Sequence, residues 1–292
     1  AADEQSHDAS LRLEAVWEPS PDYYFLAGGR TQLSWLADED DPDEEEESTT
    51  LSELHGYFRD VAGSGWDLQV GRQDFDERRE WLYDQNLDGL RAIRSAPGWR
   101  LELSLSSVLS DGSERDEDST NLIAYLSNND LRRHAAAYVI HRQADSDEHA
   151  THLGARAYGE WFEGHDLWAE GAWLSGEDAV DLEGYGFDLG TTWSPARAAL
   201  PGLALTAGYA LGSGDDDPTD GDDTFRQTGL QDNNDRLAGV TSFRYYGELF
   251  DPELSNLGIA TLGVGARPSP KSSLDLLLHK YDQIEAFAGL VN

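Results

Sequence analysis

The chain has 292 residues, and its 57 Asp and Glu against 21 Lys and Arg give a formal net charge of −36. A chain this acidic does not bind nucleic acid through a basic face, and the lack of cysteine excludes disulfide bonds and thiolate chemistry. No run of about 18 apolar residues predicts a membrane-spanning helix, while 9 Trp, 12 Tyr and 9 Phe exclude a disordered chain.

Apolar residues recur at alternate positions along most of the chain, which is the period of a β-strand. In chain order the alternating segments are 11–17, 25–35, 66–70, 99–105, 153–161, 167–173, 185–193, 203–209 and 274–278. The clearest is 99–105, which reads Trp-Arg-Leu-Glu-Leu-Ser-Leu. No stretch carries an apolar stripe at helical spacing over three turns. The sequence therefore predicts an all-β chain.

Three features favour a membrane barrel over a soluble sandwich. Each segment runs about 10 residues, the length of a tilted membrane-spanning strand. Short connections such as 95–98 and 127–130 alternate with long polar ones such as 38–48 and 74–85, as turns and loops do in outer-membrane barrels. Tryptophans near the segment ends fit two aromatic girdles. We expect a transmembrane antiparallel up-and-down β-barrel in the bacterial outer membrane, with about 14 strands in this chain.

The alternation of short and long connections also constrains residues 212–256. The next short turn after the strand at 203–211 is 268–272, so everything between forms one extracellular segment. We expect a single β-barrel domain over 1–292, in which 212–256 gates or plugs the pore. With short turns in the periplasm, the chain starts and ends outside, whereas complete barrels start and end in the periplasm. We therefore expect a chain that is incomplete at both ends, the alternative being a missed strand.

Several motifs resemble the alginate export family of bacterial outer-membrane β-barrel porins. They are Gly71-Arg72-Gln73, residues 79–84 (Arg-Glu-Trp-Leu-Tyr-Asp), Asn86-Leu87-Asp88, residues 228–233 and residues 245–252. The resemblance covers most of residues 9–281. It implies a complete barrel of about 18 strands that passes an acidic exopolysaccharide through an arginine-rich constriction, without ATP and without bond-making chemistry.

Along each strand, polar residues alternate with apolar ones. The polar residues face the lumen, and several of them are arginines. The candidates to line the substrate path are Arg12, Arg30, Arg59, Arg72, Arg91, Arg100 and Arg156. The candidates for a gate are Arg226, Arg244 and Tyr246. A guanidinium binds a uronate carboxylate through two parallel hydrogen bonds, and several weak sites in series let a polymer advance by exchange. Acidic residues share this parity, so the alternative is that these arginines form the ion pairs of an ordinary barrel interior.

The predicted function is a porin that conducts an anionic, alginate-like exopolysaccharide by passive diffusion through an arginine-lined lumen. Outer-membrane lipid is a second expected partner, periplasmic secretion-complex proteins are further candidates, and nucleic acid is not expected. One alternative is a general small-solute porin, because the lumen parity carries both signs of charge. The other is a soluble halophilic β-protein that binds acidic glycans, since an acidic chain with only two lysines, Lys271 and Lys280, is typical of salt-loving organisms.

The chain has no G-x-S-x-G, no H-E-x-x-H and no G-x-x-x-x-G-K, so we expect no enzyme and no catalytic residue. We also expect no cofactor. The acidic runs 38–47 and 215–223 could bind Ca²⁺ through carboxylate oxygens, although neither has the spacing of an EF-hand loop.

Overall fold

The computed structural model describes residues 5–38, 41–107, 119–130, 132–144, 148–196, 200, 202–216 and 221–286. Apart from one 3-10 turn, Val61–Gly63, these residues form strands and loops. Within these ranges, no helix is long and apolar enough to cross a membrane.

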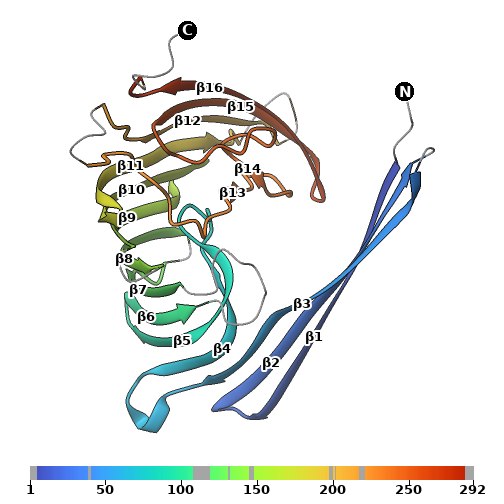
Figure 1. Ribbon diagram of the computed structural model, residues 1–292, viewed down its shortest axis with the longest axis vertical. Coiled ribbons are helices and arrows are strands. Elements are labelled where there is room, and N and C mark those ends of the chain that lie inside the picture. Colours follow the sequence, from blue (N-terminus) through green and yellow to red (C-terminus); the bar gives the residue numbers. More distant parts are fainter. Residues whose placement is uncertain are drawn as a thin grey trace.

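Fourteen of the described strands form one antiparallel sheet, in which each strand pairs with the strands that come before and after it in the chain, except that β12 pairs with β15. They are β1 (Gln5–Ser20), β2 (Tyr23–Asp38), β3 (Asp41–Phe58), β4 (Asp67–Asp76), β5 (Asp84–Ala96), β6 (Trp99–Ser107), β7 (Thr120–Ser127), β8 (Arg133–Gln143), β9 (His149–Phe162), β10 (His165–Asp178), β11 (Val180–Trp193), β12 (Ala204–Gly212), β15 (Leu257–Ser269) and β16 (Ser272–Gln283). This confirms the predicted up-and-down topology. The sheet is curled but not closed, because β1 and β16 are its two edges (Figure 1).

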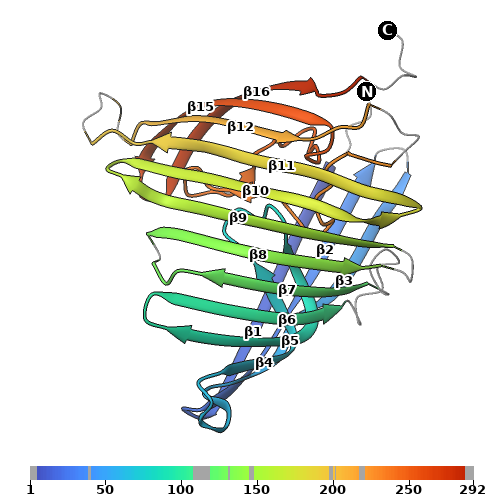
Figure 2. The same cartoon turned by 90° about the vertical axis from the view of Figure 1, so that its left-hand side faces the viewer.

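The one long excursion follows β12, which pairs with β15 rather than with the next element. We call residues 213–256 the long segment. Within its described residues, 213–216 and 221–256, the only strands are the two-residue β13 (Asn234–Asp235) and β14 (Phe243–Arg244). The second inward element is the inner loop, residues 77–83, which connects β4 to β5. Both lie on the concave side of the sheet formed by β4–β12, β15 and β16, hereafter the curled part (Figures 1 and 2).

Polar and apolar side chains alternate along the strands, but the apolar ones face outward, which is the reverse of a soluble protein. On β11, Asp188 is buried against the inner loop, whereas the neighbouring Leu189 is 48% exposed on the outer face. On β16, Leu274, Leu276 and Leu278 are likewise exposed. An outer face that is apolar and an inner face that is polar are the arrangement of a barrel surrounded by lipid. No described sheet packs against this outer face.

Strands β1–β3 form a separate arm of the sheet. β3 pairs with β4 at only five positions, Leu54–Phe58 against Leu68–Arg72. Beyond this junction the three strands extend away from the curled part (Figure 1). We call them the N-terminal arm.

The boundaries of several long connections differ from the prediction. Residues 38–48 were expected to form a loop, but β2 continues to Asp38 and β3 begins at Asp41. Strand pairing satisfies backbone N–H and C=O groups whatever the side chains are, so acidic composition alone did not end the strands. The 74–85 connection shortens to 77–83. Residues 175–181, which were also expected to form a long polar connection, instead extend β10 and β11 to a tight turn at Ala179. Two further long connections were expected at 110–120 and 143–149, and of these residues 110–118 and 145–147 lie outside the described residues.

Candidate functional site

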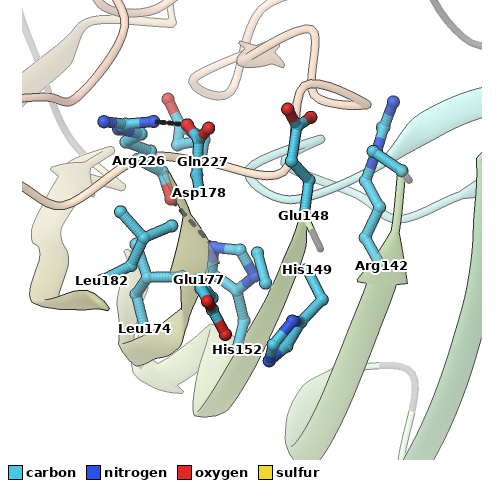
Figure 3. Close-up of a pocket in the computed structure, with 12 residues that line it drawn as sticks. Arg142, Glu148, His149, His152, Leu174, Glu177, Asp178, Leu182, Arg226 and Gln227 are labelled. Atoms are coloured by element: carbon cyan, nitrogen blue, oxygen red, sulfur yellow. Dashed lines mark hydrogen bonds and ion pairs between the residues drawn. The ribbon is translucent and has the colours of Figure 1, made fainter. Parts of the chain in front are cut away.

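One end of the interior lies where long connections join the strands, and we call it the long-loop end. Here the long segment makes its first contacts with the sheet. His152 Nε2 on β9 donates to the carbonyl oxygen of Arg226 at 2.8 Å, and Arg226 Nη1 binds Asp178 at 2.7 Å (Figure 3). Arg226 also pairs with Asp222. The side chains of His152, Asp178 and Arg226 border a small cavity of about 160 Å³. Arg226, a predicted gate residue, is therefore held by two carboxylates between the sheet and the long segment.

The inner loop is held in shape by its own first residue. The Glu77 carboxylate accepts hydrogen bonds from the backbone N–H groups of Arg79, Trp81 and Leu82. Trp81 and Leu82 are fully buried. Because two large apolar side chains lie next to each other in this loop, it packs into the interior rather than projecting into water.

Side chains of the long segment donate hydrogen bonds to backbone carbonyl groups of the inner loop. Gln227 donates to the carbonyl of Trp81, Thr228 to that of Leu82, and the Tyr245 hydroxyl to that of Arg79 at 3.0 Å. The Trp81 ring stacks on Phe225 with centroids 5.8 Å apart. The two inward elements are therefore one packed unit, joined by residues about 150 positions apart in sequence.

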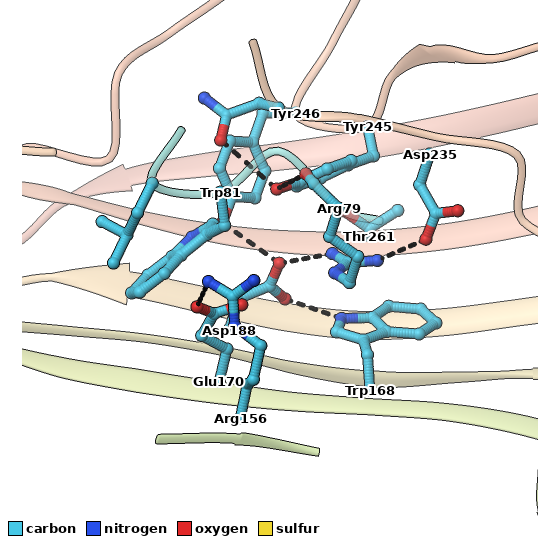
Figure 4. A network of polar contacts seen from close by, with 12 residues as sticks. Arg79, Trp81, Arg156, Trp168, Glu170, Asp188, Asp235, Tyr245, Tyr246 and Thr261 are labelled. Atoms are coloured by element: carbon cyan, nitrogen blue, oxygen red, sulfur yellow. Dashed lines mark hydrogen bonds and ion pairs between the residues drawn. The ribbon is translucent and has the colours of Figure 1, made fainter. Parts of the chain in front are cut away.

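Arg79 of the inner loop binds two carboxylates from different elements. Its guanidinium is 2.6 Å from Asp188 on β11 and 2.8 Å from Asp235 in the long segment (Figure 4). It also lies over the rings of Trp168 and Tyr245, 4.6 Å and 4.2 Å from their centroids. Burial acts to lower the pKa of Arg79, but the carboxylates outweigh it and raise this pKa above its ordinary value. The guanidinium therefore stays charged in the interior.

Arg156 on β9 forms a second buried cluster directly beside the first. It pairs with Glu77 of the inner loop and with Glu170 on β10 at 2.5 Å, and Glu170 accepts a hydrogen bond from Tyr138 at 2.9 Å. Together, Arg79 and Arg156 face four carboxyl groups, those of Glu77, Glu170, Asp188 and Asp235. We call this set the buried ion network.

Tyr246, a predicted gate residue, joins the network to the long segment. Its hydroxyl accepts a hydrogen bond from Trp81 Nε1 at 2.8 Å and donates one to Asp188 at 3.1 Å. Burial raises the pKa of Tyr246 well above its ordinary value, so the hydroxyl keeps its proton and can donate. Arg244, the third predicted gate residue, instead pairs with Asp232 and Asp251 in the long segment itself.

A larger cavity lies at the opposite end of the interior, where short turns join the strands. The inner loop separates it from the long-loop end. The cavity has a volume of about 630 Å³ and extends from Phe75 and Arg78 down to the β7–β8 turn at Asn128–Asp130. Two predicted path residues, Arg91 on β5 and Arg100 on β6, line it together. We call it the short-turn cavity.

The remaining predicted path residues lie elsewhere. Arg72 is buried and binds Asp88 at 3.1 Å and the carbonyl oxygen of Leu51 at 2.8 Å. Arg12, Arg30 and Arg59 belong to the N-terminal arm and its short turn, where Arg12 lies 3.7 Å from Glu53 and Arg59 lies 3.3 Å from Glu18. The structure thus places three of the seven arginines in the arm and its short turn, Arg156 in the buried ion network, Arg91 and Arg100 in the short-turn cavity, and Arg72 in a separate ion pair between β4 and β5.

Arg79 and Glu77, central to the network, were not among the predicted site residues. Both fall in a connection that was interpreted as an extracellular loop. The signal that could have found them is the Trp81-Leu82-Tyr83 run, because three large apolar or aromatic residues inside a polar loop indicate that the loop is buried.

Carboxylate oxygens that could hold a cation converge at one described place. Ligand atoms of Glu80, Asp84 and Asp232 all lie within 4.8 Å of one another, at half-buried positions. Exposed or half-exposed acidic groups commonly cluster in this way without a metal. Of the two acidic runs that could bind Ca²⁺, the side chains of 38–47 and residues 217–220 lie outside the described part of the structure.

Comparison with known proteins gives one family and several relatives. The family described as alginate export matches residues 30–288. The alginate production protein AlgE of Pseudomonas aeruginosa is 25% identical over 288 residues, an alignment that covers 78% of this chain and 56% of AlgE. AlgE of Azotobacter vinelandii is 33% identical over 107 residues, or 36% of this chain and 21% of that protein. The chain thus spans about half the length of the first relative that it matches.

The fold is shared with solved outer-membrane β-barrel porins. The crystal structure of OccK5 (OpdH) of Pseudomonas aeruginosa has a TM-score of 0.59 at 10% identity and covers 99% of this chain and 82% of that one. OccK7 (OpdD) of the same organism has a TM-score of 0.58 at 16% identity, with 99% and 80% covered. At these identities the likeness establishes the fold alone.

Proposed function

The chain belongs to the alginate export family and lies in the bacterial outer membrane, and on this premise we propose that it conducts an anionic exopolysaccharide by passive diffusion. In this proposal the polymer is a polyuronate, the lumen arginines bind its carboxylates in turn, and the long segment is the gate. Family and fold point to a transport channel rather than an enzyme.

The observation that carries the proposal is the order of guanidinium groups along the interior. Arg91 and Arg100 line the short-turn cavity, Arg79 and Arg156 lie in the buried ion network, and Arg226 lies at the long-loop end. A polymer with one carboxylate per sugar would meet an arginine at each level. Short-lived pairing at successive sites lets a charged solute advance without being trapped.

The buried ion network also indicates how the gate would work. Arg79 and Arg156 are already paired with carboxylates of the protein, and the two inward elements fill the space around them. A uronate carboxylate can replace a protein carboxylate as the partner of a guanidinium with little change in electrostatic energy. We therefore propose that the polymer passes by exchange of ion-pair partners as the long segment and the inner loop move aside.

A second candidate function is a general porin for small solutes. The observation that favours it is the mixed charge of the interior, since Arg79 and Arg156 face four carboxyl groups. An interior in which the protein's own carboxylates neutralise these arginines would bind a polyanion weakly.

Single-channel conductance of the full-length protein in planar bilayers separates the two functions. We expect a polyuronate added on the short-turn side to block the current in a dose-dependent way, and a neutral polysaccharide of equal length to leave it unchanged. Deletion of residues 214–255, which span most of the long segment, should raise the open-channel current. A current that is indifferent to the polyuronate supports the general porin and overturns the export proposal.

A further inference from the structure

A row of uncharged polar side chains crosses the inner wall of the curled part. Gly89 on β5 pairs with Ser106 on β6, and Ser106 pairs with Asn121 on β7. Gln73 on β4 joins this row because its Nε2 donates to the carbonyl oxygen of Gly89 at 3.2 Å. We call Gln73, Ser106 and Asn121 the polar row. They come from three of four neighbouring strands, and the fourth contributes a glycine.

The polar row is buried, but its hydrogen-bonding groups are not satisfied by the protein. Gln73 and Asn121 are 0% exposed and Ser106 is 2% exposed. Among the described residues, Gln73 Oε1, the Ser106 hydroxyl and both amide atoms of Asn121 have no hydrogen-bond partner. Buried polar groups are nearly always paired, because an unpaired one destabilises the fold. Packing of the closed interior therefore does not explain why these three side chains are polar.

The long segment covers the Asn121 end of the polar row. Leu230 of the long segment is buried in one cluster with Ile123, the next inward residue after Asn121 on β7. Arg142, which pairs with Asn121 from β8, donates to the carbonyl oxygen of Thr228 in the long segment at 3.0 Å. The proposed function requires the long segment to move, and this movement would uncover the row.

The chemistry of the polar row matches the hydroxyl groups of a sugar. A side-chain amide and a hydroxyl each offer donors and acceptors, and so does a sugar hydroxyl group. Arginines recognise the carboxylate of a uronate unit and leave its hydroxyl groups without partners. Because the row runs across the strands, it offers its contacts at one level of the pore, to one sugar unit at a time. Neutral hydrogen bonds are individually weak, which suits a ligand that has to move on.

We propose that the polar row is a binding site for hydroxyl groups of the polymer and becomes accessible only when the long segment moves aside. This inference rests on the proposed export function and adds a contact that does not depend on charge. In the closed interior the unpaired groups weaken the packing. In the open channel sugar hydroxyl groups satisfy them, so the polymer stabilises the open state as it passes.

Dwell times of polyuronate blockades in planar bilayers test the polar row in the full-length protein. Asn121→Leu keeps the branched shape of the side chain and removes its polar atoms. We expect blockades about threefold to tenfold shorter, as the loss of one neutral hydrogen bond gives. The thermal unfolding midpoint should be equal to that of the unaltered protein or higher, because no paired group is lost. A purely structural Asn121 would instead lower the midpoint and leave the dwell times unchanged.

The matched pair of variants is Ser106→Ala and Ser107→Ala. Ser107 follows in the chain, so its side chain points to the opposite face of β6, and its hydroxyl donates to the carbonyl oxygen of Ser119 at 2.7 Å. Ser106→Ala should shorten the blockades without lowering the unfolding midpoint, whereas Ser107→Ala should leave the blockades unchanged. Unchanged dwell times in both Asn121→Leu and Ser106→Ala overturn the polar row and leave the export function standing.

Labelling of a single cysteine separates the polar row from the export function, since the chain has no cysteine of its own. In Ser106→Cys, a uronic acid trisaccharide should slow the reaction with a small hydrophilic thiol reagent, and adding Asn121→Leu should reduce this protection. The neutral trisaccharide of the same linkage should protect as well, because the row binds hydroxyl groups. Protection by the acidic probe alone, or a cysteine that does not react, overturns the row. Protection by both probes without any polymer blockade of the current would reject export alone.

Discussion

The curled part and the N-terminal arm follow the same strand pattern but use their arginines differently. In the arm, Arg12 lies 3.7 Å from Glu53 and its side chain is 59% exposed. In the curled part, Arg156 pairs with Glu77 and Glu170, and its side chain is 1% exposed. The strands themselves do not create this difference. It arises because the inner loop and the long segment fill the concave side of the curled part only (Figure 1).

The comparison shows that strand parity places an arginine inside but does not decide its role. Where an inward element covers the arginine, water is excluded and the ion pair becomes part of the packing. Where no such element is present, the pair is solvated and screened. A lumen arginine is therefore structural where an inward element covers it and accessible where none does.

The prediction with the largest expected effect compares Arg156→Gln with Arg12→Gln. Removing Arg156 leaves the carboxylates of Glu77 and Glu170 buried without a cation, which should cost about 3–5 kcal/mol of unfolding free energy. Removing Arg12 breaks a pair that is mostly in water and should cost at most about 1 kcal/mol. Urea unfolding of the protein in micelles, followed by tryptophan fluorescence, measures both. Equal losses would show that the arm and the curled part are packed alike.

The same contrast explains what the sequence could and could not predict. Period-two alternation was enough for the number of strands, their pairing order and the single excursion after β12, because each strand needs only its neighbours. It could not show that Trp81 and Gln227 touch, since their contact joins positions 146 residues apart. The buried ion network depends on such contacts. Arg79 was therefore missed, and Arg91 and Arg156 shared one predicted role although they lie in different surroundings.

A second test uses glycines that differ in what lies over them. A Cβ added to Gly186 on β11 would lie 2.5 Å from the ring of Phe225 in the long segment, whereas one added to Gly28 on β2 would have nothing nearer than 3.8 Å. Gly186→Ala should therefore destabilise the protein by about 1–3 kcal/mol and loosen the long segment, while Gly28→Ala should change stability by at most about 0.5 kcal/mol. Limited proteolysis gives the sharper readout.

Cleavage within residues 213–256 should be faster in Gly186→Ala than in the unaltered protein and unchanged in Gly28→Ala. Conductance of the same two variants sharpens the comparison further, because a loosened long segment should also increase the open-channel current in Gly186→Ala. An unchanged cleavage rate in Gly186→Ala would mean that Phe225 does not hold the long segment against β11.

The smallest expected effect is a pH dependence confined to the inner loop. Burial, and then repulsion from the neighbouring Asp84, raises the pKa of Glu80 from 4.5 to about 7. Between these two values the folded loop binds a proton that the unfolded chain does not, so stability falls as pH rises through this window. Glu80 is still partly solvated, which screens the effect and makes it smaller than the two above. The measurement is the thermal unfolding midpoint at pH 5 and pH 8 in the presence of a chelator, where Glu80→Gln should remove part of the decrease and Glu163→Gln, in an exposed short turn, should leave it as it is. A decrease of the same size in all three proteins would place the titrating group elsewhere in the molecule.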